Sequence, residues 1–177
     1  MSKIIVFSGA SGVGKSTVLK LVMAARPDLR FSVSATTRAP REGEVDGVSY
    51  FFVTREEFQR MIDRGELLEY DEHFGNLYGT PISQVTSGGN VVLDVEPNGA
   101  FNARKANPEA MLIFITPPSM EELERRLRSR GDTPEDQIKL RMERAVWEME
   151  QRHWYDHVVV NDVAEDCANE ILKIIAE

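Results

Sequence analysis

The residues of this chain with the clearest chemical potential form a glycine-rich stretch, GASGVGKS at positions 9–16. It fits the pattern GxxxxGK[ST], in which glycines let successive backbone N–H groups turn toward phosphate oxygens. Lys15 would then reach the β- and γ-phosphates of a nucleoside triphosphate, and the Ser16 hydroxyl would ligate Mg²⁺. An apolar strand pattern precedes the stretch and an amphipathic helix pattern follows it, as such a loop requires. The sequence therefore predicts a phosphate-binding loop that holds ATP.

A second candidate for magnesium binding ends an apolar run, VVLD at positions 91–94. The run is typical of a buried strand, and Asp94 at its end can hold Mg²⁺ directly or through water. Many strands end in an aspartate, so this pattern indicates a magnesium ligand only when a phosphate-binding loop is present as well. Glu96, two residues further on, is predicted to point to the same side of the strand.

Two arginines lie in a polar loop, TTRAPREG at positions 36–43. Arg38 and Arg41 can grip a phosphate dianion through forked, charge-assisted hydrogen bonds. The hydroxyls of Tyr50 and Tyr78 can add to that grip. Solvated loop arginines and core tyrosines would give the same pattern, so these residues alone leave a phosphate site and a plain surface loop both open.

Glu69, in the sequence LEY, and Thr80, in YGT, have the chemistry of a purine site. A carboxylate accepts both the ring N–H and the amino group of guanine, and a hydroxyl donates to its O6. Adenine presents the wrong donor pattern to that pair. These two residues therefore favour guanine over adenine.

Several arginines gather in a helical pattern, ERRLRSR at positions 124–130, and Arg141 follows. Arg126 and Arg130 are four residues apart and share a helix face. One interpretation is an exposed helix whose arginines pair with nearby glutamates and contribute little. The other is a mobile lid that closes arginines over a transferring phosphoryl group.

The composition narrows the expected partners and setting. A length of 177 residues allows one domain with a sizeable core. The net charge of −8 argues against binding to nucleic acids or anionic membranes, because both require a positively charged protein surface. The single cysteine, Cys167, excludes an internal disulfide, and no signal peptide or transmembrane run is evident. We therefore expect a cytoplasmic monomer or homo-oligomer without nucleic-acid or membrane partners.

Short apolar runs alternate with longer helical patterns, which predicts βα units and a mainly parallel sheet. A first helix is expected over residues 15–25, and another has Pro134 in its first turn with Thr133 as its cap. Residues 35–89 break this rhythm and predict a small mixed α/β insertion. The five expected core strands cover residues 4–8, 31–34, 91–95, 111–116 and 157–160.

Together these motifs resemble the guanylate kinase family, and the match runs in register over essentially the whole chain. The motifs that carry the resemblance are the loop at 9–16, SATTRAPREGE at 34–44, GVSYFF at 47–52, LEY at 68–70, GNLYGT at 75–80, DVE at 94–96 and VND at 160–162. This combination is far more specific than the phosphate-binding loop alone.

The resemblance implies an α/β fold with a five-stranded parallel P-loop core and helices on both faces, a small mixed α/β GMP-binding insertion and a helical lid. It implies ATP as phosphoryl donor, Mg²⁺ as cofactor, and GMP together with dGMP as acceptors in purine nucleotide metabolism. The corresponding boundaries are 1–33 and 90–177 for the core, 34–89 for the insertion, and 119–145 for the lid within the core.

With the motifs above, the resemblance also assigns site residues. Catalytic roles fall on Lys15, Arg38, Arg126, Arg130 and Arg141, and magnesium binding falls on Ser16 and Asp94. ATP binding falls on Gly9, Ala10, Ser11, Gly12, Val13, Gly14, Lys15, Ser16, Thr17, Arg126, Arg130 and Asn161. GMP binding falls on Ser34, Arg38, Arg41, Tyr50, Glu69, Tyr78, Thr80, Asp94 and Glu96.

Three positions depart from the family's pattern. Ala10 replaces a common proline, which should leave the backbone loop intact; Glu96 stands where some members carry aspartate; Asn98 stands where glutamine or histidine is usual. Two alternatives stay open. One is a kinase of the same fold that acts on another phosphorylated acceptor, and the other is a guanylate-kinase-like protein-interaction module without catalysis.

Overall fold

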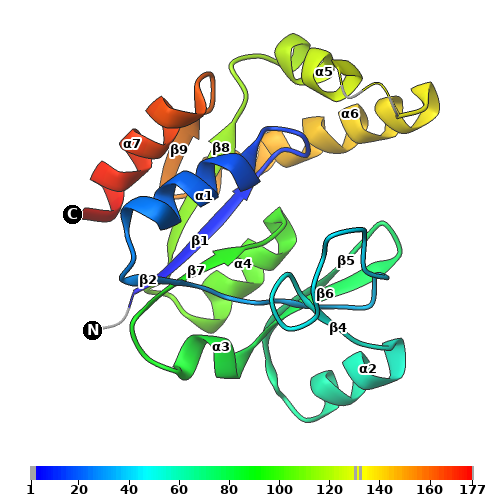
Figure 1. Ribbon diagram of the computed structural model, residues 1–177, viewed down its shortest axis with the longest axis vertical. Helices are drawn as coiled ribbons and strands as arrows, with labels where there is room; N and C mark the ends of the chain where they lie inside the picture. The colour runs from blue at the N-terminus through cyan, green and yellow to red at the C-terminus, as the bar shows by residue number, and fades with distance from the viewer. Residues whose placement is uncertain (1–2, 130, 132, 177) are drawn as a thin grey trace. The chain divides into compact units, whose positions relative to one another are not determined.

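The computed structural model describes residues 3–129, 131 and 133–176. Its main sheet holds five parallel strands in the order β2-β7-β1-β8-β9 (Figure 1). This arrangement confirms the parallel α/β core that the sequence predicts. The strands are β1 (Ile4–Gly9), β2 (Leu29–Phe31), β7 (Asn90–Asp94), β8 (Met111–Thr116) and β9 (His157–Val160).

The described part of the chain also contains seven α-helices and a second sheet. The helices are α1 (Lys15–Ala25), α2 (Arg55–Asp63), α3 (Ile82–Thr86), α4 (Pro97–Ala106), α5 (Met120–Ser129), α6 (Glu135–Glu150) and α7 (Ala164–Ala176), with a 3₁₀ helix η1 (Gln151–Trp154). The second sheet has the order β4-β3-β6-β5 and consists of β3 (Ala35–Thr36), β4 (Phe51–Phe52), β5 (Leu67–His73) and β6 (Asn76–Pro81).

The chain divides into two compact units. The first comprises the described residues up to Val6 together with Asp28–Met111, and it holds β2, β7, α3, α4 and the whole second sheet. The second comprises Phe7–Pro27 and the described residues from Leu112 onward, and it holds the loop at 9–16, α1, β9 and the helices from α5 onward.

In the second unit an apolar cluster anchors the glycine-rich loop. Ala10 from the loop packs with Leu123 and Leu127 of α5 and with Ala145 of α6, all of them buried. Burial of a leucine side chain contributes about 1.5–3 kcal/mol, so the start of the loop is tied firmly to α5 and α6. Elsewhere in the unit, α1 and α7 pack side by side (Figure 1).

In the first unit the second sheet combines parallel and antiparallel pairs. β3 pairs with β4 in parallel and with β6 antiparallel, and β5 pairs antiparallel with β6. The turn between β5 and β6 uses Phe74 and Gly75, whose φ values are 48° and 76°. Successive left-handed residues are typical of a tight hairpin turn. Helix α4 packs against β5 in this unit.

Strand β2 begins earlier than the sequence predicts. The prediction places it over residues 31–34, but it covers Leu29–Phe31 and therefore includes Arg30. The guanidinium of Arg30 donates to the carbonyl oxygens of Gly88 and Gln84 at 3.1 and 3.0 Å. These hydrogen bonds compensate for the free-energy cost of removing the charged Arg30 side chain from water.

The start of α6 also differs from the prediction. Pro134 lies in the N-cap position with φ −58° and ψ 151°, and the helix itself begins at Glu135. Thr133 is therefore not the capping residue. A proline fits here because it has no N–H that the helix would need to satisfy.

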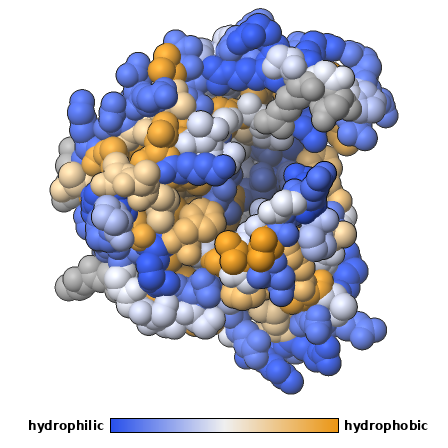
Figure 2. Space-filling model, in the orientation of Figure 1, coloured by the Kyte–Doolittle hydropathy of each residue, from blue (hydrophilic) through white to orange (hydrophobic). Residues whose placement is uncertain are grey.

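Figure 2 shows hydrophilic residues over much of the visible face, with hydrophobic residues gathered in patches between them; the content of charged residues, 28%, is that of an ordinary globular protein. Within residues 3–129, 131 and 133–176, no helix has the length and apolar character needed to cross a membrane.

Candidate active site

The loop at 9–16 connects β1 to α1 and is shaped by left-handed glycines. Gly12 and Gly14 have φ values of 84° and 87°, a conformation that L side chains rarely adopt. Gly14 is the N-cap residue of α1, and no described side chain caps the helix there. The first turn of α1 therefore offers its amide N–H groups and its dipole to an anion.

The beginning of the loop fits tightly. A Cβ at Gly9 would lie 2.5 Å from the carbonyl oxygen of Ile115, so only glycine fits at the end of β1. Ala10, the position that departs from the family's pattern, is 2% exposed and lies in the apolar cluster with α5 and α6. The loop is thus compatible with alanine at this position.

Contacts from outside hold the loop in shape. The backbone N–H of Ser11 donates to Glu148 Oε2 at 2.9 Å. Asn161 Nδ2 donates to the carbonyl oxygen of Val13 at 2.7 Å, and Arg126 Nη1 donates to the carbonyl oxygen of Asn161 at 2.9 Å. Asn161 and Arg126, both predicted on the ATP side, therefore meet at the loop.

The polar residues that follow the glycines lie on the first turn of α1. Lys15 is half-buried, whereas Ser16 and Thr17 are exposed. The N–H of Thr17 bonds back to the carbonyl oxygen of Gly14 at 3.2 Å, which closes the turn. An exposed hydroxyl at Ser16 is a suitable oxygen ligand for Mg²⁺.

The arginines predicted for a lid differ in their surroundings. On α5, Arg126 Nε bonds Glu122 Oε1 at 2.8 Å, and hydrogen bonds from Arg125 and then Arg126 lower the pKa of Glu122 to about 2. Arg141 lies half-buried on α6 and, in the described part of the chain, makes no hydrogen bond or ion pair with the loop. Arg130 lies outside the described residues.

In the first unit Arg38 is held in a fixed orientation. Its guanidinium makes a two-pronged ion pair with Glu44, at 2.8 and 3.0 Å, and lies over the ring of Tyr50 with Cζ 5.3 Å from the centroid. Hydrogen bonds from Arg38 and from the backbone N–H of Arg41 lower the pKa of Glu44 to about 2. Arg38 and Arg41 are thus joined through one carboxylate.

The second sheet gathers the tyrosines around this arginine. Tyr78 on β6 pairs in register with the end of β3, just before Arg38, and Tyr50 immediately precedes β4 on the other side of β3. The rings of Tyr50 and Tyr78 meet edge to face with centroids 6.1 Å apart. Ser34 is half-buried just before β3, where its carbonyl oxygen accepts the N–H of Phe51 at 2.8 Å.

A buried carboxylate lies on the neighbouring strand pair. Glu69 on β5 faces Thr80 on β6, is 5% exposed, and accepts the Thr80 hydroxyl at 2.6 Å. Burial raises the pKa of Glu69 to about 7, with a smaller upward contribution from the charge of Asp71. A Cβ at Gly99 would lie 2.8 Å from Glu69 Oε2, so glycine at this position makes room for the carboxylate.

The two other acidic residues of the predicted site, Asp94 and Glu96, lie between the end of β7 and the start of α4. Asp94 is the last residue of β7 and is half-buried. Glu96 occupies the N-cap position of α4, and its Oε1 lies 3.9 Å from His73 Nε2. Asn98, on the first turn of α4, is exposed. Within the described residues no group of three or more His, Cys, Asp or Glu side chains could hold a metal by itself.

Two carboxylates that were not among the predicted site residues each hold one of the two predicted loops in place, one in each unit. Glu44 organises Arg38, and Glu148 holds the N–H of Ser11. A signal for Glu148 exists in the sequence, because it lies three residues after Ala145 on the buried face of α6. An acid on an apolar helix face needs a partner. No comparable spacing rule applies to Glu44, which lies in an irregular loop.

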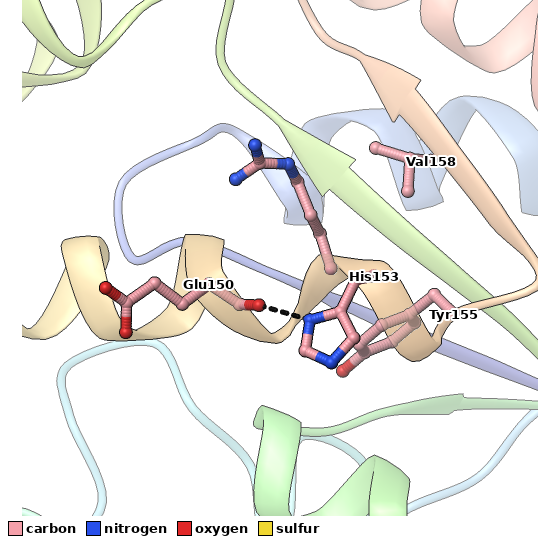
Figure 3. Close-up of a pocket in the computed structure, with 5 residues that line it drawn as sticks. Glu150, His153, Tyr155 and Val158 are labelled. Carbon is pink, nitrogen blue, oxygen red and sulfur yellow. Dashed lines mark hydrogen bonds between the residues drawn. The ribbon is translucent and has the colours of Figure 1, made fainter.

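The second unit also contains a separate cavity of about 520 Å³, lined by Glu150, Arg152, His153, Tyr155 and Val158. Figure 3 shows Val158 on β9 and the other labelled side chains on and around η1, with His153 Nδ1 donating to the carbonyl oxygen of Glu150 at 2.6 Å. None of these five residues belongs to the predicted site.

The fold and the left-handed glycine loop between β1 and α1 define a class of protein, an α/β nucleotide-binding protein of the P-loop kind. Comparison with known proteins narrows the class. The profile of the family described as "Guanylate kinase" matches residues 1–177, and the chain belongs to the guanylate kinase family.

Individual relatives agree with that assignment. A guanylate kinase of Thermus thermophilus is 46% identical over 177 residues, covering 98% of this chain and 80% of the relative. One of Trichodesmium erythraeum is 46% identical, with coverage of 98% and 95%. The crystal structure of guanylate kinase from Anaplasma phagocytophilum is similar with a TM-score of 0.78 and 36% identity, covering 99% of this chain and 85% of that chain.

Proposed function

We propose that this chain transfers the γ-phosphoryl group of ATP to GMP, giving GDP and ADP. Family membership and relatives that carry the name guanylate kinase support the proposal. The structural observation that carries it is the buried carboxylate of Glu69, fixed by the hydroxyl of Thr80 inside the insertion. A carboxylate in that setting is suited to a base with two adjacent N–H donors, which describes guanine.

On the donor side, ATP binds to the loop at 9–16. The amide N–H groups at the start of α1 bind the phosphate oxygens, and Lys15 neutralises the β- and γ-phosphates. Ser16 and Asp94 are the proposed protein ligands of Mg²⁺. A hydroxyl and a carboxylate suit this hard cation, which takes its other ligands from substrate phosphates and water. When bound, the metal supplies charge neutralisation at the phosphates.

On the acceptor side, Arg38, Arg41, Tyr50 and Tyr78 bind the phosphate of GMP. The ion pair with Glu44 already holds the guanidinium of Arg38 in one orientation, so little side-chain entropy is lost when the phosphate binds. Forked hydrogen bonds from arginine suit a phosphate dianion.

The base of GMP is read by Glu69, Thr80 and Ser34. The carboxylate of Glu69 accepts the ring N–H and the amino group, Thr80 keeps that carboxylate oriented, and the Ser34 hydroxyl donates to O6. Asp94 and Glu96 lie on the nucleoside side. Because these contacts address the base and the phosphate rather than the 2′-hydroxyl, dGMP is an acceptor as well.

The chemical step needs no side-chain nucleophile. An oxygen of the GMP phosphate attacks the γ-phosphorus in line, a new P–O bond forms, and the bond from the γ-phosphorus to the β–γ bridging oxygen breaks to release ADP. That phosphate is already ionised at neutral pH, so no general base is required. Lys15, Arg126, Arg130 and Arg141 stabilise the charge on the transferring group, with Arg38 holding the acceptor.

Each segment of the chain has a proposed role in this reaction. Residues 1–33 and 90–177 form the ATP-binding core, residues 34–89 form the GMP-binding insertion, and residues 119–145 form the lid.

Release of ADP in a coupled assay, with GMP, dGMP, AMP, UMP and a ribose phosphate as acceptors, tests this function. We expect fast turnover with GMP, turnover with dGMP, and rates at least about 100-fold lower with the others, because a buried carboxylate left without its donors is penalised. Equal or faster turnover with AMP would indicate a kinase for another acceptor. Absence of turnover with every acceptor would indicate an interaction module.

A further inference from the structure

Glu148 is a fully buried carboxylate in the second unit. It lies on the inward face of α6 and is 0% exposed. Moving a carboxylate out of water costs several kcal/mol unless other groups compensate for it. Its presence among apolar neighbours therefore calls for an explanation.

Contacts with Ser11 and Arg144 contribute to the compensation. Glu148 Oε2 accepts the backbone N–H of Ser11 at 2.9 Å, and Oε1 accepts Arg144 Nε at 3.2 Å from one turn earlier on the same helix. Arg144 in turn lies over the ring of Trp147, with Cζ 4.2 Å from the centroid. The carboxylate is thus fixed from the α6 side and reaches one specific amide of the glycine-rich loop.

Glu148 could act on anion binding directly, on the stability of the core, or on the shape of the loop, and its negative charge helps to separate these roles. A negative charge near a loop that binds phosphates weakens anion binding through its Coulomb field. A buried carboxylate is also a poor choice for stability alone, since an apolar residue of similar volume often stabilises a core better than a buried ion pair does. The geometry instead serves the loop, because the bond fixes Ser11, which follows the anchored Ala10 and precedes the left-handed Gly12.

We infer that Glu148 is a positioning residue for the phosphate-binding loop, with Arg144 holding its carboxylate in place. Its bond to the Ser11 N–H sets the path of the loop so that the later amides face the phosphates of the nucleotide. The inference rests on the proposed function only in that the loop binds the phosphates of ATP.

The test is binding of ADP and of GMP, each alone, measured by calorimetry for Glu148→Gln and Glu148→Ala, with thermal unfolding of each variant. Glu148→Ala is expected to weaken ADP binding about tenfold, because the loop loses its charged acceptor. Glu148→Gln keeps an acceptor oxygen and is expected to weaken it about threefold. GMP affinity should stay within about twofold in both variants. Glu143→Ala, an exposed acid on α6, is the matched control and should leave both affinities unchanged.

A role in stability alone lowers the unfolding temperature of a variant but not the affinity of its folded fraction for ADP. ADP affinity that is unchanged or tighter in Glu148→Gln would overturn the inference, since removal of a negative charge by itself tightens binding of an anion. This variant keeps the test decisive even if Glu148→Ala does not fold. A wild-type chain that binds ADP but fails to phosphorylate GMP would overturn the proposed function while leaving the result on Glu148 interpretable.

Discussion

The glycine-rich loop and the arginine loop both suit phosphate, but they are built in different ways. The loop at 9–16 uses backbone N–H groups, and the surrounding side chains of Glu148 and Asn161 hold its shape. The arginine loop at 36–44 uses side chains, and Arg38 is oriented by another side chain, Glu44. The glycine-rich loop depends on the conformation of its backbone, and the arginine loop depends on the functional groups of particular side chains.

This difference predicts how each region responds to substitution. In the glycine-rich loop, changes matter where they alter backbone conformation or remove Lys15. In the insertion, a change of one functional group removes one substrate contact. Because each region is proposed to bind one substrate, its variants should affect the kinetics of that substrate alone.

The largest effect is expected from Lys15→Ala. Turnover should fall by roughly 1,000-fold or more, because the charge on the transferring phosphoryl group loses its closest cationic side chain. GMP affinity, measured by calorimetry, should stay nearly unchanged. Lys20→Ala, an exposed lysine on α1, serves as the control and should keep normal turnover. Near-normal turnover in Lys15→Ala would mean that the loop is not the site of phosphoryl transfer.

Glu69→Gln should produce the next largest effect. The variant replaces a charged acceptor by an amide whose N–H₂ faces the N–H groups of guanine, so GMP affinity should fall by roughly 100-fold. The KM for ATP should change little. Glu72→Gln, an exposed acid on the same strand, is the control. Unchanged GMP affinity would remove Glu69 from the base pocket.

A smaller effect is expected from pH, because the pKa of Glu69 is raised to about 7 by burial. Only the ionised carboxylate accepts both guanine donors, so GMP affinity should fall about tenfold between pH 8 and pH 6. The phosphate of GMP titrates in the same range, and Glu69→Gln supplies the baseline that contains this contribution alone. The same slope in the wild type and in the variant would contradict the assignment.

The raised pKa of Glu69 also has a consequence for stability. Its folded-state pKa of about 7 lies above the ordinary value of 4.5, so the folded chain binds this proton more tightly than the unfolded chain. The associated stability is fully present below about pH 4.5 and is lost as the pH rises through 7. Thermal unfolding without nucleotide should therefore show a smaller loss over this window in Glu69→Gln than in the wild type.

The smallest effect is expected from Glu44→Gln. Loss of the two-pronged ion pair frees Arg38 to rotate, which weakens GMP binding, while removal of a negative charge beside the phosphate strengthens it. The net result should be a KM for GMP about threefold higher, with the KM for ATP unchanged. Glu42→Gln in the same loop is the matched control. A shift in the KM for ATP instead would contradict the separation of the two regions.

The parts of the fold that the sequence predicts are those with a local cause. The helix over residues 15–25 and the strands over 111–116 and 157–160 have the predicted bounds, since apolar periodicity and Pro27 mark their ends. The glycine-rich loop is equally local, because eight consecutive residues specify its backbone. In the second sheet, the pairing of β5 with β6 places Glu69 opposite Thr80, which the sequence did not predict.

The parts that the sequence does not predict depend on distant partners. Glu148 meets Ser11 across 137 positions of the chain, and no spacing rule connects them. Strand β2 includes Arg30, which pairs with Val91 of β7, and backbone carbonyls 54 and 58 residues away accept its guanidinium. In each case a charged residue lies where a local rule disfavours it, and a tertiary contact compensates.

The most direct test of phosphoryl transfer to GMP follows the phosphoryl group itself. ATP labelled at its γ-phosphate is incubated with the wild-type chain, Mg²⁺ and unlabelled GMP, and the products are separated by chromatography. We expect the label to appear in GDP, in an amount equal to the ADP formed, and we expect Lys15→Ala to give almost none. Label recovered as inorganic phosphate, or label left in ATP although GMP is bound, would contradict this expectation.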